Sequence, residues 1–280
     1  MTAETTPVAT RRGVMPEPTT PDAPDRRSWF ADTWTVMVRE LRPVAREPFN
    51  LVFGLVQPLV FLGLFGPLLA GSLGDTGVLG PDVWQWFVPA ILVMLTLFGS
   101  STTGANLQLE MQTGAHERLL VTPLPRSSQL VGRSLKEMVP IVAQAVVIVL
   151  VMLPFGFALH GTGAVLGLLL LGVLGVGLGS LSYTLALAVR SQEWMFWAVQ
   201  QTVLFPAMIL SGMLLPLENG PGWMQVAARA NPVAYVVDAE RALFAGEVWS
   251  STVAWGWVAA LLTAAVGLAA GVRAISRSTD

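Results

Sequence analysis

The sequence predicts an all-α integral membrane protein with six transmembrane helices and both termini in the cytoplasm. Its 280 residues are 53% hydrophobic and only 12% charged. Six apolar stretches each reach the roughly 20 residues that a helix needs to cross a bilayer. All sixteen lysines and arginines except Arg229 and Arg241 fall on one side of these stretches. The side rich in basic residues faces the cytoplasm.

The N-terminal part divides into a tail and an interfacial helix. Residues 1–28 contain five prolines among threonines and charges, and such a composition predicts a disordered cytoplasmic tail. Residues 29–48 predict an amphipathic helix lying along the membrane surface, which Pro43 and Pro48 are expected to break. Its apolar face holds Trp29, Phe30, Trp34, Met37, Val38 and Leu41, and its opposite face holds Asp32, Arg39, Glu40 and Arg42.

A single transmembrane domain is expected over residues 49–273, followed by a short cytoplasmic tail over 274–280. The six spans are predicted at about 50–73, 84–107, 138–159, 162–189, 194–217 and 252–272. Glycines in the first and fourth spans favour close helix packing.

The connection between the second and third spans carries most of the charge near the membrane. From Glu110 to Lys136 it includes six charged residues, which would cost on the order of 15 to 20 kcal/mol at bilayer depth, so we expect it to lie in water. The apolar period of its first half predicts a helix from Glu110 to Val121. Thr122 precedes Pro123, and a residue before proline is pushed out of the helical region, so the helix should stop there. A turn is expected at 125–128.

A further helix is expected outside the membrane before the last span. Asn231 followed by Pro232 is a capping side chain ahead of a proline at the first helical position, and Gly246 is a plausible stop. Asp238 and Arg241 are three residues apart, a spacing that favours an ion pair. The pattern fits an extracellular surface helix and a re-entrant helix equally well.

Several classes of function are excluded by what the sequence lacks. None of the predicted spans contains Asp, Glu, Lys or Arg, which argues against a proton-coupled antiporter, a charged ion pore or a membrane enzyme using acid-base residues. There is no cysteine, the two histidines are far apart and the net charge is −2, so neither a metal site nor nucleic-acid binding is expected. The only lysine, Lys136, is followed by Glu137, so a Walker A sequence is absent.

Two segments resemble one family of transporters. The segment ERLLVTPLPRSSQLVGRSLKE, over residues 117–137, resembles the loop between spans two and three of type-2 permeases of ATP-binding-cassette exporters, in the branch that includes daunorubicin-resistance permeases. Glu117, Arg118, Thr122, Pro123 and Arg126 carry this resemblance. The segment NPVAYVVDAERALFAG, over 231–246, resembles the outer helix of the same permeases.

The resemblance implies that the 110–136 connection docks on a separate ATPase, which would bind ATP and Mg. The expected complex holds two ATPase subunits and a second permease copy in a bacterial-type plasma membrane. The coupling residues would be Glu110, Glu117, Arg118, Leu119, Thr122, Pro123 and Arg126. The outer helix, with Asn231, Pro232, Asp238 and Arg241, would cap the pathway.

In the resembled exporters, spans two and five of two copies face each other across the cavity. The expected wall for a hydrophobic substrate is therefore Phe98, Thr102, Asn106, Gln200, Gln201, Phe205 and Met208. Polar groups in these spans could instead serve helix-to-helix hydrogen bonding. The function expected is export of hydrophobic drugs. An exporter of lipid or lipid-linked glycan, and an ATPase-independent membrane scaffold or sensor, remain alternatives.

Overall fold

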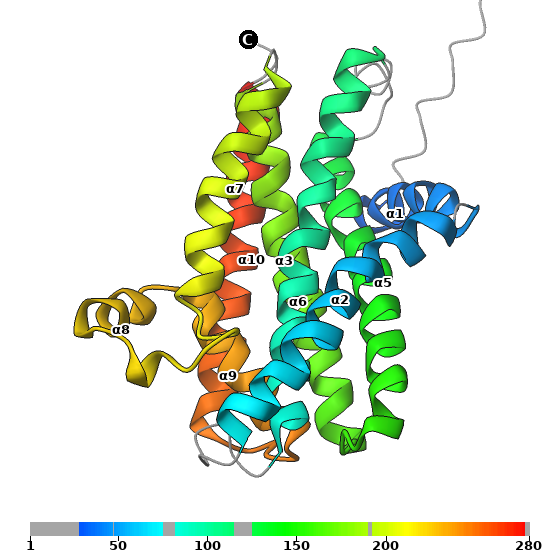
Figure 1. Ribbon diagram of the computed structural model, residues 1–280. Coiled ribbons are helices and arrows are strands. Elements are labelled where there is room, and N and C mark those ends of the chain that lie inside the picture. Colours follow the sequence, from blue (N-terminus) through cyan, green and yellow to red (C-terminus); the bar gives the residue numbers. More distant parts are fainter. Residues whose placement is uncertain (1–27, 47, 75–81, 115–124, 190–191, 278–280) are drawn as a thin grey trace, which may run out of the picture.

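The computed structural model describes residues 28–46, 48–74, 82–114, 125–189 and 192–277. Within these ranges the chain forms a helical bundle in which five helices are long and apolar enough to cross a membrane (Figure 1). The helices are α1 (Trp29–Arg46), α2 (Pro48–Leu73), α3 (Val83–Gln112), α5 (Arg126–Met152), α6 (Gly161–Ala188), α7 (Glu193–Ile209), α8 (Gly222–Arg229), α9 (Pro232–Phe244) and α10 (Ser251–Arg277). Short 3-10 turns lie at η2 (Leu153–Phe155) and η3 (Leu217–Asn219).

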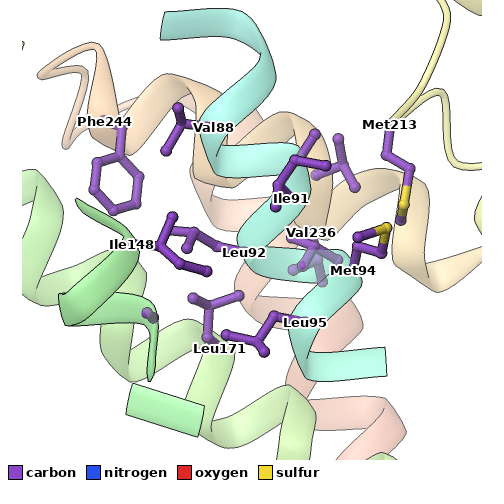
Figure 2. Close-up of a cluster of buried hydrophobic side chains, with 14 of the residues drawn as sticks. Val88, Ile91, Leu92, Met94, Leu95, Ile148, Leu171, Met213, Val236 and Phe244 are labelled. Carbon is purple, nitrogen blue, oxygen red and sulfur yellow. The ribbon is translucent and has the colours of Figure 1, made fainter. Parts of the chain in front are cut away.

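Helix α3 lies at the centre of the bundle. It contacts α2, α5, α6, α7 and α9, and its side chains from Phe87 to Met94 are buried, Pro89 included. Figure 2 shows the outer half of α3 packed against side chains from α5, α6 and α9, among them Ile148, Leu171 and Val236. An α3 covered on nearly every side explains why its outer half is a continuous apolar run.

Small residues bring α6 close to its neighbours, as the glycine-rich sequence predicts. A Cβ at Gly177 would lie 2.7 Å from the backbone nitrogen of Ala264 in α10, and a Cβ at Gly163 would collide with the Leu243 carbonyl in α9. Backbone contact of this kind is how membrane helices gain packing energy without a hydrophobic driving force.

The helix predicted at this place forms as α1, and one side of it packs on α5. Gly132 of α5 lets α1 cross closely, because a Cβ there would lie 2.8 Å from the Thr33 carbonyl oxygen. The side facing α5 includes the buried Asp32, Thr33 and Val36, whereas Phe30 and Trp34 are 77% and 63% exposed. The apolar face is therefore available to lipid. Pro43 does not break the helix, which continues to Arg46.

The fifth predicted span, at 194–217, is only partly helical. Helix α7 has 17 residues and ends at Ile209, which gives it a length of about 25 Å, short of a bilayer core of about 30 Å. Gly212 has a φ of +71°, a left-handed conformation that glycine adopts readily. The chain then turns away into η3 and α8, so the crossing by six spans stays a prediction.

Two further boundaries differ from the sequence prediction. Helix α5 begins at Arg126, so the expected turn at 125–128 is instead the first turn of a helix that continues into the third span. Helix α3 ends at Gln112, and Gly114 has a φ of +67°. A helix continuous from Glu110 to Val121 is therefore wrong at Gly114, and the residues beyond it lie outside the described ranges.

Candidate functional sites at the two ends of the bundle

Four side chains from four helices meet at the end of the bundle where α1 crosses α5 (Figure 1). We call Glu40 of α1, Glu110 of α3, Arg133 of α5 and Tyr183 of α6 the inner charge cluster. Arg133 Nη2 lies 2.6 Å from a Glu110 carboxylate oxygen and 3.7 Å from one of Glu40. The guanidinium carbon is 5.9 Å from the centre of the Tyr183 ring. One arginine therefore connects the interfacial helix to three helices of span length.

The inner charge cluster is largely shielded from solvent. The Arg133 side chain is 8% exposed and that of Glu110 is 26% exposed. One turn further along α5, Lys136 Nζ lies 3.5 Å from Glu137 Oε1, and both residues are buried. The expectation that Arg133 and Lys136 lie in water is wrong, because α1 and α6 cover them and acidic partners offset the cost of burial.

Hydrogen bonds extend the contacts at this end of the bundle. Gln108 of α3 donates to the Ala186 carbonyl of α6 at 3.0 Å. Gln112, the last residue of α3, donates to Glu193, the first residue of α7, at 3.3 Å. The inner ends of α3, α6 and α7 are thus held to one another as well as to α5.

The structure describes two of the predicted coupling residues. Glu110 belongs to the inner charge cluster, and Arg126 is the first residue of α5. The other predicted coupling residues lie outside the described ranges, namely Glu117, Arg118, Leu119, Thr122 and Pro123. The sequence reasoning missed Glu40 and Tyr183. Glu40 was placed on the face of α1 opposite the apolar one, and the one local sign that another helix passes there is Gly132.

The predicted cavity wall is divided between two surfaces. Phe98 and Phe205 meet edge to face with ring centroids 6.2 Å apart, joining α3 to α7. Thr102 and Asn106 follow Phe98 at intervals of four residues and are exposed on the same side of α3. This stripe is the part of α3 that the single chain leaves uncovered.

The remaining predicted wall residues, all on α7, do not share that exposed stripe. Gln200 is buried and accepts a hydrogen bond from Ser182 at 3.3 Å, and Met208 is 5% exposed. Gln201 is half-buried. Gln200 thus takes part in helix-to-helix hydrogen bonding, the alternative role that the sequence left open. An apolar groove of about 650 Å³ lies elsewhere, between α6, α9 and α10.

The outer helix α9 has the predicted cap. Asn231 Oδ1 accepts from the Val233 amide at 3.1 Å, and Pro232 is the first helical residue. The Asn231 amide also donates to the Ala207 carbonyl of α7 at 2.7 Å. Helix α9 ends at Phe244, just before Gly246, whose φ is +92°. Its apolar face is buried against α3, α6 and α10, so α9 is part of the bundle.

The charged residues on α9 differ in their partners. Arg241 lies 3.6 Å from Asp238, as the spacing predicted. Burial raises the pKa of Asp238, and Arg241 opposes that change. Glu240 is fully buried, and neither carboxylate oxygen has a hydrogen-bond partner among the described residues. Burial raises the pKa of Glu240 well above its ordinary value, and its carboxyl group packs against Gly167 of α6.

Comparison of the sequence with known protein families identifies the family of this chain. The family profile described as ABC-2 type transporter matches residues 31–245. The chain belongs to this family. The match begins in α1 and ends directly after α9, so it includes both the inner charge cluster and the outer helix of this ABC-2 transporter chain.

Relatives of this ABC-2 chain include permeases named for drug resistance. It is 26% identical over 227 residues to the daunorubicin resistance permease DrrB1 of Streptomyces coeruleorubidus, covering 80% of this chain and 79% of the relative. It is 29% identical over 266 residues to the probable doxorubicin resistance permease DrrC of Mycobacterium tuberculosis, covering 89% and 91%. It is 28% identical over 202 residues to the probable multidrug permease YbhR of Escherichia coli, covering 67% and 51%. The ABC-2 chain is thus a multi-pass protein of the cell membrane.

Proposed function

We propose that this chain is the membrane-spanning permease subunit of an ATP-driven exporter of hydrophobic drugs or related compounds. Two permease copies would work with two separate ATPase subunits, which bind ATP and Mg and perform the hydrolysis. Both termini would lie in the cytoplasm, with six crossings of the membrane. The family and the names of the relatives support the class of transporter.

The inner charge cluster is the observation that carries the proposal. Glu110 lies in the last turns of α3, directly before the 115–124 connection that resembles the ATPase-docking loop. Through Arg133, a push on that connection or on α1 would reach α3 and α5 together. Removing Arg133 from this partly exposed pair should cost about 2–4 kcal/mol, so we expect the contact to persist while such a push moves the helices.

The exposed surfaces of α3 and α7 support a hydrophobic substrate and a second copy. Thr102 and Asn106 are exposed on α3, and Trp194 and Phe205, which share one face of α7, are 69% and 47% exposed. The surface that they form is apolar with a few neutral polar groups. A second permease copy facing it would enclose a pathway suited to uncharged, apolar compounds.

Reconstitution tests the proposal directly. The chain would be co-expressed with an ATPase that co-purifies with it and placed in vesicles with a hydrophobic drug, a labelled phospholipid or a lipid-linked glycan. An ATPase inactivated in its nucleotide site is the matched control. ATP-dependent drug accumulation supports the proposal. Movement of lipid or glycan alone would favour the alternative exporter, and absence of both transport and a co-purifying ATPase would favour a scaffold or sensor.

A further inference from the structure

We propose that Arg241 is a positioning residue that holds the outer end of α3 to the turn that follows α7. It does so through hydrogen bonds to two backbone carbonyls, one of which must be released when the pathway opens outward. The inference rests on the proposed transport function. It concerns the outer end of the bundle, at the opposite end from the inner charge cluster.

The contacts of Arg241 join three separate elements. Its Nε donates to the Trp86 carbonyl of α3 at 3.1 Å, and its Nη2 donates to the Gly212 carbonyl beyond α7 at 3.0 Å. The guanidinium carbon lies 3.8 Å from the centre of the Trp86 ring. The third nitrogen, Nη1, is 3.6 Å from Asp238 on the same helix. Each guanidinium nitrogen thus has a partner.

The chemistry of the site calls for arginine. Gly212 lies in the turn after Ile209, where the helix that would have paired its carbonyl has ended. Gly212 is buried, and a buried carbonyl is costly without a donor, so non-helical backbone there must be satisfied by protein or water. A planar guanidinium can reach two carbonyls in different directions at once, whereas the ammonium of lysine is a point charge.

The site keeps its charge despite its burial. The Arg241 side chain is 17% exposed, and burial lowers its pKa to about 10, an effect that Asp238 opposes. The guanidinium therefore remains protonated at neutral pH. The cation also stacks on an aromatic face, an arrangement that strengthens as water is excluded.

Opening of the pathway would strain this arrangement. Arg241 joins the elements that carry Phe98 and Phe205, whose rings meet in the bundle. If α3 and α7 separate, one guanidinium cannot stay within hydrogen-bond distance of both carbonyls. A cavity of about 290 Å³ beside Arg241, lined by Trp86, Gly212 and Asp238 among others, provides room for water at the carbonyl that is released.

The natural absence of cysteine allows a direct test. A single cysteine replaces Phe205, and a membrane-impermeant maleimide is added from outside to vesicles holding the permease with its ATPase. Arg241→Met should raise the labelling rate between about fivefold and about 100-fold, the range expected when a coupling between two states is removed. Arg241→Lys should fall between Arg241→Met and the parent.

Arg229→Met is the matched control, because Arg229 is the other outer arginine, is exposed and lies at the end of α8. It should label within about twofold of the parent. A second reporter cysteine at the fully buried Ala145 of α5 detects general loosening. Faster labelling at both reporters in Arg241→Met would mean destabilisation and would overturn the positioning role. Parent-like labelling of Arg241→Met at Phe205, or full rescue by Arg241→Lys, would overturn it as well.

Transport is measured in parallel on the cysteine-free variants, as drug moved per ATP hydrolysed. Arg241→Met should lower this ratio several-fold while Arg229→Met leaves it unchanged. If the parent complex transports none of the tested compounds, the proposed function fails, whereas the labelling result still decides the role of Arg241.

Discussion

Replacing Arg133 with methionine should be among the most destabilising changes at the inner end of the bundle. The substitution keeps an aliphatic stem but leaves Glu110 and Glu40 without the cation that lies 2.6 Å and 3.7 Å away. Breaking a fully buried pair costs about 3–5 kcal/mol. Because Glu110 is 26% exposed and water can reach it in part, we expect about 2–4 kcal/mol in the free energy of unfolding.

The assay is unfolding of the purified chain by SDS in mixed micelles, with a double-mutant cycle. Glu110→Gln combined with Arg133→Met should cost less than the sum of the single changes by about 2 kcal/mol, because residues in direct contact are coupled. Arg39→Met, at an exposed position of α1, should stay within about 0.5 kcal/mol of the parent. Additive losses in the cycle, or equal losses at Arg133 and Arg39, would refute a stiff junction.

Three further predictions address coupling, pH and packing. Glu117→Ala with Arg118→Ala should leave membrane insertion intact but abolish drug accumulation by the reconstituted complex; normal pumping would remove both residues from the coupling role. Because the pKa of Glu240 is raised on folding, the free energy of unfolding should fall as pH rises from about 4.5 to the folded pKa, by at most about 1.4 kcal/mol per pH unit. Glu240→Gln should flatten this profile. An unchanged profile in that variant would contradict a raised pKa at Glu240. Gly177→Leu would drive a side chain into the α10 backbone and should prevent folding, whereas Gly63→Leu, which meets nothing within 4 Å, should accumulate normally in the membrane.

Local signals in the sequence predicted the caps and the long helices well. The pair formed by Asn231 and Pro232 sets the start of α9, and Gly246 lies just past its end, because capping is decided within a few residues. The apolar runs of α2, α3, α5, α6 and α10 are long enough that no other structure is compatible with them.

Features that depend on the packing of distant segments could not be predicted in this way. The sequence placed Arg133 in water because its neighbours are polar, yet Glu40, 93 residues earlier, covers it. The contact of Asp32 and Glu40 of α1 with the bundle was missed for the same reason, since a pattern shows which residues share a face and not what that face contacts. The end of α7 at Ile209 was missed as well, because the 194–217 stretch carries no charged residue to mark a boundary before Glu218.

Because α7 ends at Ile209, bending at this end of the bundle costs less free energy than it would in an unbroken helix. An unbroken helix bends only by giving up backbone hydrogen bonds along its length. Here α7 has ended, and side-chain hydrogen bonds from Asn231 to Ala207 and from Arg241 to Gly212 join α9 to α7 and to the turn that follows it. Such a joint can pivot by exchanging one or two partners with water. Helix α7 can therefore tilt while α9 keeps its place in the bundle, and the bending is confined to the turn between them.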